Sequence, residues 1–211
     1  MRWAFLILWL VPSLAYSFEN GTLLFVENGH NIVEKYTHSS YSHVAIVVDE
    51  QVYEAEPPKI HKMTVEDWFT KIGKDNEGSG SPEVVSIMVP KKSYTEEETA
   101  KMKEFLESQV GRRYSIKGYV RKQPGDGIHC AELCSEALEK SGRCDFSTPN
   151  CQFSPGSLHD TLSDHQQVGK KLYVRTKDEY RRTTCSRWKD WWCHKGTTCS
   201  WSCWETLTFC R

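Results

Sequence analysis

The pattern of apolar and polar residues predicts its clearest strand at Tyr41 to Val48. Val44 to Val48 is apolar on both faces, so we expect this strand at the centre of a sheet. Asp49-Glu50-Gln51 predicts a tight connection to a hairpin partner, Val52 to Ala55, which Pro57-Pro58 ends. Further strands are expected at Gly21 to Phe25, Val84 to Val89 and Leu172 to Val174.

Two longer segments have the apolar spacing of amphipathic helices. Thr95 and Glu98 form a capping box, and the helix that they open carries its apolar residues on one face until Gly111 ends it. The second helix begins near Cys130, after a turn-forming run, with apolar positions at Cys130, Leu133, Cys134, Ala137 and Leu138. Shorter segments are expected as a helix after Thr64 through Trp68 and Phe69, a helix from Pro155 to Leu162, and a helical or irregular turn from Ile32 to Tyr36.

Both ends of the 211-residue chain differ from its middle. Residues 1–17 combine Arg2, an apolar run too short to span a bilayer, and small residues at Ala15-Tyr16-Ser17, which together predict a cleaved signal peptide. We therefore expect a secreted, extracellular protein. The composition changes after Asp178, so we predict a main domain at 18–178 and a Cys/Trp-rich tail at 179–211. The net charge of −1 gives no indication of a nucleic-acid partner.

All nine cysteines lie after position 129. In an oxidising compartment an odd number favours four disulfides and one free thiol. Cys130 is the natural thiol to remain free, although Cys134 fits the same parity as a buried, inert one. Cys144 and Cys151 predict a disulfide-tied loop. The candidates for pairing are Cys134, Cys144, Cys151, Cys185, Cys193, Cys199, Cys203 and Cys210.

Cys130 is a candidate nucleophile because of its place in the second long helix. Unpaired backbone N–H groups and the positive end of the helix dipole gather in the first turn, where they favour thiolate over thiol. The alternative is that Cys130 simply packs in the core, since cysteine is among the most buried residue types.

A cysteine nucleophile needs a base, and the base needs a group that orients it. His43 lies at the entry of the central strand and is the first candidate, with a merely structural histidine as the alternative; His129 ranks second because neighbours on a helix point in different directions. If two or four residues close the hairpin after Val48, Glu54 shares a face with His43 and can accept its N–H. Glu56 has the same parity but is expected to face solvent.

The order of these segments resembles the NlpC-type papain-like cysteine hydrolases, more narrowly their circularly permuted YiiX/YebB-like branch. The resemblance spans roughly Phe18 to Tyr173. One departure is Thr22, where the family usually has aspartate after glycine. The similar segments are Gly21-Thr22-Leu23-Leu24, Tyr41-Ser42-His43-Val44-Ala45-Ile46-Val47, Tyr53-Glu54-Ala55 and Cys130-Ala131-Glu132-Leu133.

The resemblance implies an α+β, papain-like core with an antiparallel sheet packed on helices, and a Cys130–His43 pair with Glu54 as third polar residue. It predicts a thiol hydrolase that cleaves amide bonds, with peptide amides of bacterial cell walls as the substrate class and no cofactor. One alternative is acyl transfer on lipids, because the lecithin:retinol acyltransferase group shares the permuted order. Another is a non-catalytic, disulfide-stapled binding protein.

The tail from Tyr180 to Arg211 is unusually rich in tryptophan, cysteine and basic residues. So many indoles cannot all be buried in a small appendage, so we expect it to contact a glycan or a membrane surface. The alternative is that it wraps the main domain and buries its tryptophans there. Cys193, His194, Cys199 and Cys203 do not match a paired zinc-binding pattern, so no metal site is predicted.

Overall fold

The computed structural model describes residues 18–27, 39–75, 84–162 and 165–173. The expected signal peptide, the Cys/Trp-rich tail and the turn at Ile32 to Tyr36 lie outside the described residues. Within the described part of the chain, no helix is long and apolar enough to span a membrane.

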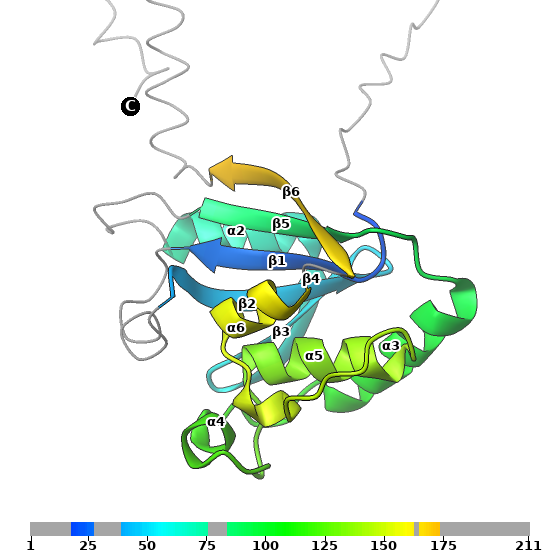
Figure 1. Ribbon diagram of the computed structural model, residues 1–211. Helices are drawn as coiled ribbons and strands as arrows, with labels where there is room; N and C mark the ends of the chain where they lie inside the picture. Colours follow the sequence, from blue (N-terminus) through cyan, green and yellow to red (C-terminus); the bar gives the residue numbers. More distant parts are fainter. Residues whose placement is uncertain (1–17, 28–38, 76–83, 163–164, 174–211) are drawn as a thin grey trace, which may run out of the picture.

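The described residues form a six-stranded sheet in which every neighbouring pair is antiparallel (Figure 1). Its order is β4-β3-β2-β1-β5-β6. The strand predicted to be central, β2, therefore has two strands on one side and three on the other. The strands are β1 (Thr22–Glu27), β2 (Tyr41–Val48), β3 (Gln51–Glu56), β4 (Lys59–Thr64), β5 (Val84–Pro90) and β6 (Gln166–Tyr173). The expected mixed architecture with an antiparallel sheet and helices is confirmed.

Helices cover both faces of the sheet (Figure 1). One face packs on α2 (Val65–Asp75), and the other on α3 (Glu96–Gln109), α5 (Cys130–Lys140) and α6 (Pro155–Thr161). A 3₁₀ turn, η1 (Asn150–Gln152), packs beside α5, and a short α4 (Lys117–Arg121) packs on η1. The predicted capping box at Thr95 and Glu98 is present, and the cysteine helix begins at Cys130 itself.

The sheet separates two apolar cores. Alternate residues of β2 enter each: Val44 and Ile46 pack with α5, whereas Ala45 and Val47 pack with Trp68 of α2. This double burial explains why β2 reads as a continuous apolar run. A strand buried on both faces holds its side chains in fixed positions, which is what the polar residue at its entry, His43, requires.

A two-residue turn sets the register between β2 and β3. Asp49 and Glu50 both have positive φ, 49° and 57°, as the primed hairpin turns require, and Val48 pairs with Gln51. The even turn places His43 and Glu54 on the same face, as predicted for a turn of two residues. The ladder ends at Ile46 and Tyr53, so the strands pair no further toward His43 and Glu54.

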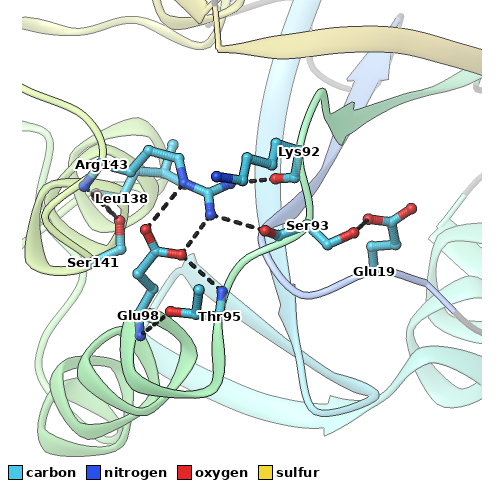
Figure 2. Close-up of polar contacts among 8 residues, drawn as sticks. All are labelled: Glu19, Lys92, Ser93, Thr95, Glu98, Leu138, Ser141 and Arg143. Carbon is cyan, nitrogen blue, oxygen red and sulfur yellow. Dashed lines mark hydrogen bonds and ion pairs between the residues drawn. The ribbon is translucent and has the colours of Figure 1, made fainter.

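Arg143 fixes the far end of the cysteine helix (Figure 2). Its guanidinium binds the Glu98 carboxylate, donates to the carbonyls of Lys92 and Ser93, and lies 3.8 Å from the centre of the Tyr94 ring. Glu98 also accepts from the Thr95 backbone N–H at 2.7 Å in the capping box of α3. The contacts join the segment that follows α5 to the start of α3.

The expected disulfide between Cys144 and Cys151 is wrong. Cys130, Cys134, Cys144 and Cys151 are all free and buried in the described part of the chain. The physical reason is that the loop sends the two side chains to different neighbours: Cys144 meets Tyr94, while the Cβ of Cys151 packs against Gly118 of α4. Parity therefore does not single out Cys130; its surroundings must do so.

Candidate active site

Cys130 is the first residue of α5, and His129 caps the helix before it. The Nδ1 atom of His129 accepts from the Glu132 N–H at 3.4 Å, and the Glu132 carboxylate accepts from the His129 N–H at 3.4 Å. The other ring nitrogen, Nε2, donates to the carbonyl of Cys151 at 3.3 Å. Both nitrogens therefore contact backbone groups. Histidine is not among the residues preferred at a helix N-cap, so this role could not be predicted from the sequence.

His43 and Glu54 form the pair that hairpin parity predicted. The Nε2 atom of His43 lies 2.9 Å from Oε2 of Glu54. The Glu54 side chain is 0% exposed and that of His43 is 17% exposed. Because Nε2 faces Glu54, Nδ1 is the ring nitrogen left for the thiol.

Glu54 is held by two further donors from α2 that the sequence analysis missed. The indole N–H of Trp68 donates to Oε2 at 2.8 Å, and the Lys71 ammonium donates to Oε1 at 2.7 Å. Lys71 also pairs with Glu56, so Glu56 is not simply directed to solvent as expected. The i, i+3 spacing of Trp68 and Lys71 places them on one helix face, but nothing in the sequence says that this face covers Glu54.

The charged forms of Glu54 and His43 stabilise each other. Burial disfavours the carboxylate of Glu54, but the hydrogen bond from His43 and the attraction of His43 and Lys71 outweigh it and lower its pKa to about 2. Burial likewise disfavours a charged His43, yet hydrogen bonds with Cys130 and Glu54 raise its pKa to about 10. Cys130 and Glu54 together therefore hold His43 in its protonated form.

Cys130 completes the group from the opposite side of the sheet. The residue is 6% exposed, and its thiol is in hydrogen-bonding contact with both His129 and His43. Burial opposes ionisation, but the imidazoles of His129 and His43 outweigh it and lower the pKa of the thiol to about 6. Of the two imidazoles, His43 is the one backed by the buried carboxylate of Glu54, at 2.9 Å, so it is the better placed to move a proton to a substrate.

The other described thiols have the opposite electrostatics. Cys134 lies one helical turn after Cys130 and is 0% exposed; burial raises its pKa well above the usual value. Burial also raises the pKa values of Cys144 and Cys151. The structure therefore distinguishes Cys130 from Cys134, which the cysteine count could not.

Tyr114 is a further neighbour that the sequence did not indicate. Burial, followed by the nearby charges of Cys130 and Glu56, raises the pKa of its phenol. Tyr114 therefore stays a neutral O–H donor across the pH range in which Cys130 changes from thiol to thiolate.

The fold is similar to a solved structure, the metalloprotein YiiX from Escherichia coli O157:H7. The match has a TM-score of 0.54 at 14% identity and covers 75% of this chain and 99% of that one. It supports the YiiX-like part of the resemblance at the level of fold, while the papain-like placement stays a prediction. No family model matches the sequence, and no curated protein matches it either.

The neighbour's description as a metalloprotein raises the question of a metal in this chain. In the part that the structure describes, no group of three or more His, Cys, Asp and Glu side chains is arranged to hold a metal ion. The carboxylate of Glu54 is already bound by His43, Trp68 and Lys71, and His129 by backbone groups. These residues do not fit a metal centre, and we derive no step through one.

Proposed function

We propose that this protein is a papain-like cysteine hydrolase that cleaves amide bonds, with Cys130 as nucleophile, His43 as acid and base, and Glu54 as the residue that orients His43. The observation that carries the proposal is geometric: Cys130 starts a helix and contacts an imidazole whose far nitrogen is 2.9 Å from a fully buried carboxylate, an arrangement that lowers the pKa of the thiol. A structural cysteine needs no such arrangement, and Cys134 on the same helix lacks it.

The chemistry follows from the protonation states. The Cys130 thiolate attacks the amide carbonyl, and protonated His43 gives its proton to the leaving amine as the C–N bond breaks. A thioester between Cys130 and the acyl group remains. Neutral His43 then takes a proton from water, the resulting hydroxide attacks the thioester, and the acid leaves as the thiolate and protonated His43 are restored.

The start of α5 offers a donor for the oxyanion. The Cys130 N–H belongs to the first helical turn, where backbone N–H groups have no partner within the helix. A tetrahedral oxyanion formed on the Cys130 sulfur lies close to that N–H by covalent geometry. We assign it as one donor of the oxyanion hole.

The substrate class comes from the resemblance to NlpC-type hydrolases, which favours peptide amides of bacterial cell walls. A secreted protein with this activity acts on cell-wall debris or on an invading microbe. The secretion signal and the surface-binding tail remain part of this proposal, since both lie outside the described residues.

Trapping of the acyl-enzyme tests the proposal directly. The purified chain is mixed with soluble cell-wall peptides and quenched in acid, and intact-mass and peptide-mapping spectrometry locate the adduct. We expect a peptidyl thioester on Cys130, lost in Cys130→Ser and kept in the matched control Cys134→Ser. A fatty-acyl adduct formed from phospholipid instead would support lipid acyl transfer, and an unmodified Cys130 with every peptide and lipid would support a binding protein.

A further inference from the structure

Exposed aliphatic side chains are concentrated in one short segment. Among the described residues, the exposed large hydrophobics are Val110, Ile116 and Val120, at 41%, 51% and 68%. Single exposed apolar residues need no explanation, but three within eleven residues do. The segment lies between α3 and the cysteine helix.

Ile116 and Val120 share one face of α4. Ile116 caps this helix, and its carbonyl accepts from the Val120 N–H at 3.1 Å, so the two side chains lie one turn apart. The opposite side of α4 is anchored, because Gly118 is buried and a Cβ there would lie 3.5 Å from the Cβ of Cys151. The aliphatic face is therefore directed away from the described part of the protein.

The same segment carries a concentrated positive charge. Residues 110–125 contain no Asp or Glu, in a chain whose net charge is −1. Their five basic residues are Arg112, Arg113, Lys117, Arg121 and Lys122. All of these except Arg112 are exposed, and none of the exposed four has an ion pair with another described residue.

This surface borders the candidate active site. The ring of Tyr119 in α4 meets the ring of His129 edge to face at 5.9 Å, and His129 caps the helix that begins with Cys130. Figure 1 shows α4 next to the start of α5, with β6 at the opposite end of the view. Tyr119 therefore connects α4 to the residue that caps the cysteine helix.

We propose that α4 docks the protein on anionic phospholipid membranes. Ile116 and Val120 enter the boundary between headgroups and acyl chains, while Arg113, Lys117, Arg121 and Lys122 pair with lipid phosphates and carboxylates. Aliphatic side chains one turn apart gain little from a nucleic-acid backbone, which basic and aromatic residues bind. The surface does not depend on Cys130 being a nucleophile.

Vesicle sedimentation of the full chain tests this surface. Vesicles of phosphatidylcholine are compared with vesicles that also contain phosphatidylserine, and we expect binding to the second kind. Lys117→Gln/Arg121→Gln should weaken that binding about 25-fold, since each basic residue near an anionic surface contributes about five-fold. Ile116→Ser/Val120→Ser should weaken it at least about ten-fold through the lost insertion of two aliphatic side chains.

The matched control removes the same charge elsewhere. Lys92→Gln/Lys101→Gln, at exposed positions away from α4, should bind anionic vesicles like the unaltered chain. Circular dichroism establishes that each variant is folded. Vesicle binding that survives both α4 double variants lies elsewhere on the chain and overturns the proposal. Loss with the charge variant alone would reveal a general polyanion site and overturn it too, as would no binding by the unaltered chain.

Discussion

Replacing His43 by glutamine should move the reactivity of Cys130 to higher pH. Glutamine keeps a donor for the buried carboxylate of Glu54 but removes the positive charge beside the thiol. With His43 the pKa of Cys130 is about 6, and its ordinary value is 9.0. At pH 6 the thiolate therefore falls from about half of the molecules to about one in a thousand when the full shift is lost.

The rate changes less than the thiolate population. A more basic thiolate is a better nucleophile, and a Brønsted slope of about 0.4–0.5 over three pKa units recovers about 20-fold of a loss of about 500-fold. The expected net decrease in rate with an aromatic disulfide reagent at pH 6 is about 25-fold at most, because His129 still lowers the pKa of the thiol. The decrease should shrink toward pH 9.

Stopped-flow absorbance gives the rate, and peptide mapping confirms that the label is on Cys130 and not on a thiol outside the described residues. Cys134→Ser is the control and should leave the profile unchanged, because that thiol is fully buried and its pKa is raised. Identical pH profiles with and without His43 would refute the ion pair and the proposed nucleophile with it.

Three further predictions concern the groups around this pair. The pKa of Glu54 is lowered to about 2 from 4.5, so its ionised form stabilises the fold by about 3 kcal/mol above about pH 4.5, and this contribution is lost as the pH falls to about 2. Urea unfolding across this range should show the loss, and Glu54→Gln should flatten the dependence of the free energy of unfolding on pH. Lys71→Met should lower the free energy of unfolding at neutral pH by about 1–3 kcal/mol, and Lys71→Arg by less, since arginine can still pair with Glu54; equal losses would show that the charge is not the cause. Arg143→Met should cost about 2–3 kcal/mol in thermal unfolding while leaving the labelling rate of Cys130 unchanged, because its contacts lie at the far end of α5; a slower rate would show that this end also positions the thiol.

Most of what places His43 beside Glu54 could be predicted from the sequence. Whether Glu54 shares a face with His43 depends on the parity of the turn after Val48, and a strand has a strict period of two. The sequence placed the turn after Val48 but could not decide how many residues it contains. By contrast, β4 was not predicted, because only Ile60 of that edge strand is deeply buried and its other residues read as a polar loop.

The partners of the buried carboxylate could not be found in the same way. Trp68 reads as an ordinary core residue and Lys71 as an ordinary surface residue of an amphipathic helix. Their roles depend on α2 packing across β3, on the face opposite the cysteine helix, and that placement is a property of the tertiary fold. His129 was ranked second as a base, and its ring both caps α5 and lowers the pKa of the Cys130 thiol.

Lys71, Glu54, His43 and Cys130 form a row of alternating charge from α2 to α5, at the point where β2 and β3 no longer pair. The order has a consequence for the proposed catalysis. A bare carboxylate beside His43 would hold its proton strongly and hinder transfer to a leaving amine. Lys71 offsets part of that charge, so the carboxylate still orients the ring but attracts its proton less. Loss of Lys71 should therefore slow the steps in which His43 releases its proton or must be neutral, while the thiolate of Cys130 is retained. A helix on the far face of the sheet would then influence turnover without any contact with substrate.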